Sequence, residues 1–252
     1  MSSMDDKVAL ITGAGSGIGR ATALLFADRG VSVAVADVDV AGGEETVQMV
    51  TSSGGEAIFV ECDVSDEQQV QMIVDRTVSA FGRLDYAHNN AGIDGAMAPL
   101  ADQPTGEYDR VTAVNLRGVF LGMKYQIPVM IGQGGGAIVN TASALGLIGF
   151  SDMAPYVASK HGVNGLTKNA ALEYATAGIR VNALCPGVVR TTMIDQIMAT
   201  MPGFEEQILA TTPMGRLAEP KEMAEVVVWL CSDAASYVTG HMLVADGGMV
   251  AQ

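Results

Sequence analysis

Residues 8–20 read VALITGAGSGIGR, in which an apolar strand leads into a glycine-rich turn that opens a helix. Glycines let the backbone turn sharply and approach a pyrophosphate, whose charge the helix N–H groups and the positive end of the helix dipole stabilise. The motif G-x-G-x-x-G is not met from Gly13, because Ile18 stands at its third glycine, and from Gly15 that position is Arg20. The pattern is T-G-x-x-x-G-I-G. Since glycine turns also join ordinary strands to helices, it favours a dinucleotide site only together with further residues.

Short β-branched and apolar runs alternate with helix-length segments along the whole chain. This alternation predicts parallel strands joined by right-handed helical crossovers. We expect an α/β fold, a single Rossmann-type domain over residues 1–252 with a doubly wound seven-stranded parallel sheet and helices on both faces. The expected strands are Val8–Ile11, Val31–Ala36, Ala57–Glu61, Leu84–His88, Ala137–Thr141, Arg180–Leu184 and one near His241–Ala245. The expected helices are Ile18–Arg29, Ala41–Thr51, Glu67–Phe81, those within Thr105–Met130, Pro155–Ala175 and Lys221–Cys231.

The composition limits the partners and the compartment. Lys and Arg total 14 against 28 Asp and Glu, and the net charge of −14 would repel nucleic acid and anionic membranes. Cys62, Cys185 and Cys231 are odd in number and lie among apolar neighbours, so we expect reduced core thiols and no metal site. Without a basic leader or a long apolar span, the chain is expected to be cytoplasmic.

An acidic residue stands where the second strand ends. Asp37 lies 18 residues beyond Gly19, where a carboxylate can accept hydrogen bonds from the adenosine ribose and repel a 2′-phosphate. No Lys or Arg occurs between Arg29 and Arg76, and Ser16 occupies a turn position where a basic residue could serve NADP. The sequence therefore favours NAD over NADP, the alternative being a strand-end acid that merely faces water.

Tyr156 and Lys160 are four residues apart at the start of a helix whose first turn holds Pro155, so both side chains project from one face. An ammonium near a phenol should lower the tyrosine pKa from about 10 and make a proton acceptor for an alcohol. Ser143 follows a strand and precedes Tyr156 by 13 residues, where its hydroxyl could bind the reacting oxygen. His88 is better explained as a structural histidine without catalytic role.

In these residues the chain resembles the short-chain dehydrogenases/reductases over nearly its whole length. The resemblance implies a catalytic tetrad of Asn115, Ser143, Tyr156 and Lys160, in which Asn115 holds a water in a proton relay and Lys160 also grips the nicotinamide ribose. It further implies assembly as a homotetramer through the long helices after Thr105 and Pro155 and the C-terminal strand. The cofactor contacts that it implies are Gly13, Ser16, Gly17, Ile18, Asp37, Asp63, Val64, Asn90, Ala91, Gly92, Tyr156, Lys160, Pro186, Gly187, Val189 and Thr191.

The substrate side of the sequence is apolar. The methionine-rich segment 191–213 surrounds Pro202 and Gly203 between two regular elements, and we expect a substrate lid there, with a surface helical hairpin as the alternative. No Lys or Arg is placed to bind a substrate carboxylate, which favours an uncharged alicyclic or aryl-aliphatic secondary alcohol or ketone. The candidate pocket residues are Met97, Ala144, Leu145, Leu147, Phe150, Met153, Met193 and Ile197.

Two other functions compete with an NAD-dependent alcohol dehydrogenase. An NADP-dependent 3-oxoacyl-carrier-protein reductase would need a basic docking surface and a basic cofactor pocket, which the charge of −14 and Asp37 oppose. A non-catalytic NAD-sensing scaffold would be expected to have lost Tyr156 or Lys160, and both are present.

Overall fold

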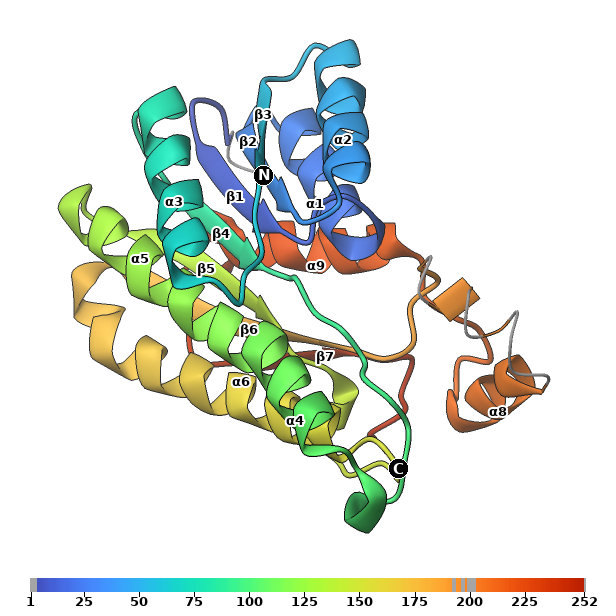
Figure 1. The fold of residues 1–252 in the computed structure, drawn as a ribbon. Coiled ribbons are helices and arrows are strands. Elements are labelled where there is room, and N and C mark those ends of the chain that lie inside the picture. Colours follow the sequence, from blue (N-terminus) through green and yellow to red (C-terminus); the bar gives the residue numbers. More distant parts are fainter. Residues whose placement is uncertain (1–3, 192–193, 196–197, 199–202, 252) are drawn as a thin grey trace.

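The computed structural model describes residues 4–191, 194–195, 198 and 203–251, and Figure 1 shows its layered arrangement. Seven strands pair in parallel in the order β3-β2-β1-β4-β5-β6-β7. The chain starts at β1 in the middle, winds outward to β3, and returns to pair β4 with the other side of β1. The strands are β1 Val8–Thr12, β2 Ser32–Asp37, β3 Ala57–Glu61, β4 Tyr86–Asn89, β5 Gly136–Thr141, β6 Ile179–Pro186 and β7 Met242–Ala245.

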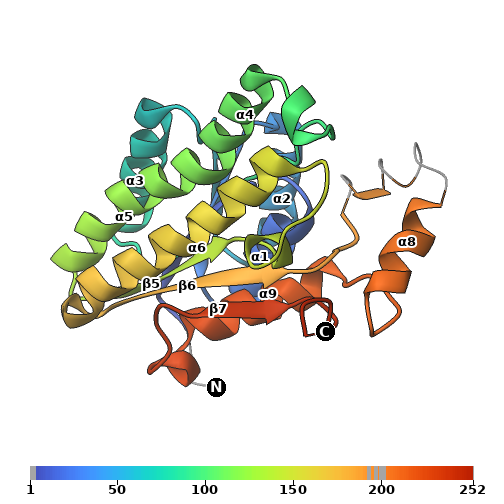
Figure 2. The ribbon, with the colours of Figure 1, turned by 90° about the horizontal axis from the view of Figure 1, so that it is seen from below.

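Helices cover both faces of this sheet, as Figure 2 shows from a second side. The helices α1, α2 and α9 lie on one face, and α3, α4, α5 and α6 on the other. The predicted fold class is therefore confirmed. The helices are α1 Gly17–Asp28, α2 Val40–Ser52, α3 Glu67–Phe81, α4 Thr105–Thr112, α5 Gly118–Gly132, α6 Ala154–Tyr174, α8 Phe204–Thr211 and α9 Pro220–Cys231.

The central strand explains why the sheet needs two helical layers. Every residue of β1 is buried, and alternate side chains enter different cores: Leu10 packs with α3 and α5, whereas Ala9 and Ile11 pack with α1 and α9. Parallel strands covered on both faces read as continuous apolar runs. The sequence 8–11 shows that pattern.

The predicted helical region 105–130 is interrupted. The segment Ala113–Arg117 forms a π-helical turn between α4 and α5, and the helix continues through Pro128. A π turn widens the helix locally and is often found at functional sites. Here it carries Asn115, whose side chain is fully buried.

Three further features bear on the sequence predictions. Cys62, Cys185 and Cys231 are buried free thiols, as expected. Within the described ranges, no helix is long and apolar enough to cross a membrane. The helix α8, inside the predicted lid, lies apart from the two helical layers in both views (Figures 1 and 2).

Candidate active site

The turn between β1 and α1 lies at the point where the direction of winding changes. Gly13 has φ +64° and Gly17 has φ +53°, both in the left-handed region that favours glycine. A Cβ on Gly13 would lie 2.8 Å from the Cα of Ala91, and one on Gly19 would lie 2.1 Å from the carbonyl oxygen of Gly13. Side chains are thus excluded at Gly13 and Gly19, which leaves bare backbone at these two positions beside the start of the helix. This arrangement fits a dinucleotide pyrophosphate.

The loop after β4 is tied to that turn. The amide of Asn90 donates to the carbonyl oxygens of Thr12 and Gly13 over 3.1 and 3.2 Å. The hydroxyl of Thr12 accepts from the backbone N–H groups of Asn90 and Ala91 over 3.0 and 3.2 Å. Asn90 therefore shapes the cofactor turn through its side chain, while Ala91 contacts the turn through its backbone.

Asp37 points toward the glycine turn from the end of β2. Its Oδ2 accepts from the N–H of Gly15 over 2.7 Å, and its Oδ1 accepts from the N–H of Asp39 over 2.9 Å. Arg20, the basic residue of the turn, forms an ion pair of 2.6 Å with Glu45 and donates to the carbonyl oxygen of Gly15. Because this guanidinium already has an acidic partner, it is poorly placed to receive a 2′-phosphate.

Ser143, Tyr156 and Lys160 come together as the sequence predicts. Nζ of Lys160 donates to the carbonyl oxygen of Thr141 over 2.9 Å and lies 5.5 Å from the centroid of the Tyr156 ring. The Tyr156 hydroxyl forms a hydrogen bond with Ser143, whose Oγ accepts from the N–H of Leu145 over 3.1 Å. The end of β5 and the first turns of α6 thus bring two hydroxyls and an ammonium into one site.

Asn115 lies beside this site but uses its side chain for support. Its Oδ1 accepts from the N–H of Ile93, and its Nδ2 donates to the carbonyl oxygen of Ile93, both over 2.8 Å. Nδ2 also lies 3.3 Å from Oγ of Ser159. A Cβ on Gly92 would lie 3.3 Å from Oδ1 of Asn115 and 3.4 Å from Nζ of Lys160. The side-chain amide of Asn115 is therefore engaged by protein atoms.

The pKa of Tyr156 departs from the prediction. Burial raises the pKa of Tyr156 to about 12, and the nearby carboxylate of Asp94 acts in the same direction. Burial lowers the pKa of Lys160 to about 8, although Asp94 opposes that change. The expectation that Lys160 lowers the tyrosine pKa below its usual value is therefore wrong here, because loss of hydration disfavours the phenolate. Tyr156 holds its proton at neutral pH.

Asp94 is the residue of this site that the sequence analysis missed. It follows β4 and lies within electrostatic reach of both Tyr156 and Lys160. The available signal was an acid at the carboxyl end of a strand, followed by Gly95, which has φ +87°.

The predicted substrate pocket is only partly supported. Ala144 is buried, Leu145 and Met153 are half-buried, and Phe150 is 47% exposed. Met97 is 48% and Leu147 39% exposed, and Met193 and Ile197 lie outside the described residues.

The other predicted cofactor residues lie at the same carboxyl edge of the sheet. A Cβ on Gly17 would lie 3.2 Å from Cγ2 of Thr191, which brings the segment after β6 against the glycine turn. Several of these positions are in contact with other parts of the protein. Asp63 accepts a hydrogen bond from Ser65, and Val64 packs on Gly118. Val189 is buried beside Ala218, and Gly187, which follows Pro186, lies close to Asp246.

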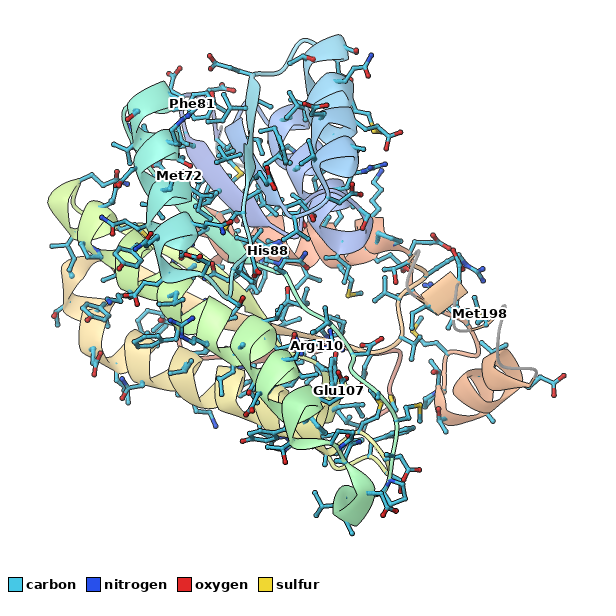
Figure 3. All side chains as sticks on the ribbon, viewed as in Figure 1. Met72, Phe81, His88, Glu107, Arg110 and Met198 are labelled. Carbon is cyan, nitrogen blue, oxygen red and sulfur yellow. The ribbon has the colours of Figure 1, made fainter. Side chains whose placement is uncertain are left out.

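His88, labelled in Figure 3, is a fully buried residue of β4. Its Nε2 lies 2.8 Å from Oγ1 of Thr141, and its Nδ1 has no hydrogen-bond partner among the described residues. Burial lowers the pKa of His88 to about 3, so the ring is neutral at physiological pH.

Comparisons with known proteins agree with this geometry. The family model described as enoyl-(acyl carrier protein) reductase matches residues 13–250. The chain is 48% identical to a 2,5-dichloro-2,5-cyclohexadiene-1,4-diol dehydrogenase of Sphingobium indicum, over 100% of both chains. It is 46% identical to a cyclohexanol dehydrogenase of an Acinetobacter species, over 96% of this chain and 94% of that one.

A solved structure is similar over the same range. The crystal structure of levodione reductase superposes with a TM-score of 0.94 at 42% identity and covers 98% of both chains. Short-chain dehydrogenases/reductases use a nicotinamide cofactor, and the relatives support an enzyme that acts on CH–OH groups. The chain therefore belongs to the short-chain dehydrogenase/reductase family.

Proposed function

We propose that this protein is an NAD-dependent oxidoreductase that interconverts an uncharged alicyclic secondary alcohol and its ketone. The observation that carries the proposal is the convergence of Ser143, Tyr156 and Lys160 at the carboxyl edge of the sheet, on the same edge as a glycine turn that has no room for a side chain at Gly13 or Gly19. The names of the relatives support the substrate class, since they are enzymes of cyclic alcohols and diols.

Each of the three residues has a distinct part in the proton step. When bound, the nicotinamide supplies or accepts the hydride. Tyr156 donates its proton to the carbonyl oxygen during reduction and, as phenolate, accepts the hydroxyl proton during oxidation. Ser143 binds the reacting oxygen, because its hydroxyl lies in hydrogen-bond contact with that of Tyr156. Lys160 would contact the nicotinamide ribose, and below about pH 8 its ammonium would stabilise the negative charge that develops on the Tyr156 oxygen as the proton is transferred.

The cofactor would lie across the carboxyl edge of the sheet. Gly13, Ser16, Gly17 and Ile18 would hold the pyrophosphate at the start of α1, and Asp37 would accept from the adenosine ribose. Asp37 retains lone pairs for this purpose, since each oxygen accepts only one hydrogen bond from the chain. The charge of this carboxylate and the pairing of Arg20 with Glu45 support NAD over NADP.

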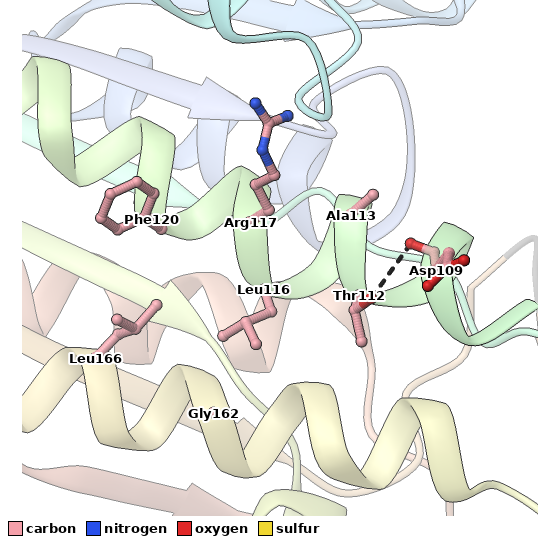
Figure 4. A pocket seen from close by; sticks show the side chains of 8 residues that line it. All are labelled: Asp109, Thr112, Ala113, Leu116, Arg117, Phe120, Gly162 and Leu166. Atoms are coloured by element: carbon pink, nitrogen blue, oxygen red, sulfur yellow. Dashed lines mark hydrogen bonds between the residues drawn. The ribbon is translucent and has the colours of Figure 1, made fainter. Parts of the chain in front are cut away.

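A groove on the outer face of α4, α5 and α6 supports assembly as a homotetramer. Figure 4 shows this groove, which has a volume of about 720 Å³ and lies between the π turn and α6. Phe120 is 47% exposed on its edge, and Leu116 lies 2.8 Å from the position of a Cβ on Gly162. Exposed apolar surface on long helices is typical of a subunit interface.

The test is a steady-state assay with cyclohexanol and either NAD or NADP. We expect NADH formation and at least tenfold higher kcat/KM with NAD than with NADP. The control variant is Tyr237→Phe, which should show the same cofactor preference as the wild type, because Tyr237 is fully exposed and far from α6 in sequence. Equal efficiency with the two cofactors would contradict the cofactor assignment, and failure with every cyclic alcohol would contradict the function.

A further inference from the structure

The loop that follows β4 is held at two points. Asn115 forms two hydrogen bonds of 2.8 Å with the backbone of Ile93. Oε2 of Glu107 accepts from the N–H of Ala96 over 3.0 Å. Asp94 lies between these two anchor points, so the position of its backbone is fixed on both sides.

The second anchor is itself rigid. Glu107 and Arg110, labelled in Figure 3, lie three residues apart on α4 and form hydrogen bonds of 2.9 and 3.0 Å. A Cβ on Gly95 would lie 2.6 Å from Cγ2 of Val111, so the loop passes close to the same helix. A loop fixed in this way can present one side chain in one place.

Within the described part of the chain, Asp94 differs from the shielded carboxylates of Asp85 and Asp37 in having no hydrogen-bond donor. Buried Asp85 accepts from Lys7 over 3.0 Å and from Arg83 over 2.6 Å, and Asp37 accepts from two backbone N–H groups. Asp94 is half-buried, yet it makes no hydrogen bond or ion pair with the part of the chain that the structure describes. A shielded carboxylate without a partner is costly, and such a group is commonly satisfied by water or by a ligand.

The carboxylate of Asp94 also lies near the residues that carry out the proton transfer, Tyr156 and Lys160. Gly92, two residues earlier, approaches Lys160 so closely that a Cβ would lie 3.4 Å from Nζ. Asp94 acts electrostatically on both Tyr156 and Lys160 but lies too far from the ammonium for an ion pair. The ammonium and the carboxylate have opposite charges, so a neutral substrate meets no net charge, whereas an anionic group held directly beside Asp94 would be repelled by it.

We propose that Asp94 is a specificity-determining residue, whose carboxylate accepts a hydrogen bond from a second hydroxyl of the substrate and excludes substrates that carry a carboxylate. This inference rests on the proposed function and narrows its substrate class to alicyclic diols and hydroxyketones. An ionised carboxylate offers only acceptors, so it pairs with a hydroxyl and repels another anion. Asp94→Asn leaves the shape unchanged and removes the charge.

Two substrate comparisons test the proposal. The first compares the best of the 1,2-, 1,3- and 1,4-cyclohexanediols with cyclohexanol, and the second compares 4-hydroxycyclohexanecarboxamide with the corresponding carboxylate. The wild type should prefer the diol and the carboxamide by about tenfold or more in kcat/KM, as expected for a hydrogen bond to a charged group. Asp94→Asn and Asp94→Ala should lower both ratios about tenfold. The control is Asp102→Asn, because Asp102 is exposed on the same connection and should leave both ratios unchanged.

A binding measurement separates this proposal from the proposed function. Calorimetric titration of the carboxylate into the NADH-loaded protein requires no turnover, and Asp94→Asn should bind it about tenfold more tightly than the wild type. The role of Asp94 alone would be overturned if wild type and variant both oxidise cyclohexanol, show the same two kcat/KM ratios and bind the carboxylate with the same affinity. Absence of turnover with every alcohol, alongside the predicted gain in carboxylate affinity, would overturn the proposed function and leave Asp94 as an anion-excluding residue.

Discussion

The ammonium group of Lys160 lies 5.5 Å from the centroid of the Tyr156 ring. Burial acts on these two groups in opposite directions, since it raises the pKa of Tyr156 to about 12 and lowers that of Lys160 to about 8. On raising the pH, Lys160 therefore loses its proton before Tyr156 does. Tyr156, the proton donor for carbonyl reduction, therefore stays protonated at pH values at which Lys160 has lost its charge.

This order predicts the pH dependence of reduction. Lys160 is protonated below about pH 8 and neutral above it, whereas Tyr156 stays protonated throughout that range. The kcat/KM for ketone reduction should be nearly constant from pH 6 to about pH 7 and should fall above about pH 8 as the ammonium loses its proton. The measurement is a rate profile with cyclohexanone, and a constant rate up to about pH 10 would contradict the role of Lys160.

Cofactor preference depends on the charge at the end of β2. Replacing Asp37 by Ser and Val38 by Arg removes a repulsive carboxylate and adds a phosphate partner at a position that is 62% exposed. The ratio of kcat/KM for NAD to that for NADP should fall at least tenfold in the double variant. An unchanged ratio would show that Asp37 does not select the cofactor.

Ser143 should affect turnover more than cofactor binding. Its hydroxyl faces Tyr156 and, by proposal, the substrate oxygen, so Ser143→Ala should lower kcat by about a hundredfold while NADH affinity changes little. Ser151→Ala is a suitable control, because Ser151 is an exposed turn residue on the same connection. A loss of NADH affinity that parallels the loss of kcat would instead assign Ser143 to the cofactor site.

The groove between the π turn and α6 should control assembly. Phe120→Glu places a charge on its apolar edge and should convert the expected tetramer into smaller species, whereas Tyr237→Ser at a fully exposed position should not. Light scattering at micromolar concentration distinguishes these outcomes. A wild-type monomer would contradict the assembly, and an unchanged tetramer in Phe120→Glu would exclude this face as its interface.

The sheet and its helices were predictable because their signals are local. The strand Ala57–Glu61 and the helix Glu67–Phe81 have the predicted bounds, since an apolar run and a following Asp66 cap specify them within a few residues. The π turn around Asn115 was not predicted. No spacing in residues 105–130 distinguishes it from regular helix, and it depends on packing against the loop at Ile93.

The members of the site could be predicted better than their electrostatics. Spacing placed Tyr156 and Lys160 on one helical face, and the structure brings them to Ser143. The direction of the Tyr156 pKa shift depends on burial and on the carboxylate of Asp94, which lies in the loop after β4. Burial and the position of Asp94 are properties of the folded chain, so the spacing of Tyr156 and Lys160 in the sequence predicted the wrong direction for the Tyr156 pKa shift.

The central claim is that the hydroxyl of Tyr156 transfers the substrate proton. Tyr156→Phe keeps the ring beside Lys160 and removes only the hydroxyl, so the most direct test pairs an NADH fluorescence titration with steady-state rates for this variant. The account predicts NADH affinity within about twofold of the wild type and a kcat lower by about a thousandfold, the scale of general acid–base catalysis. A variant that binds NADH normally and retains near-wild-type turnover would contradict it.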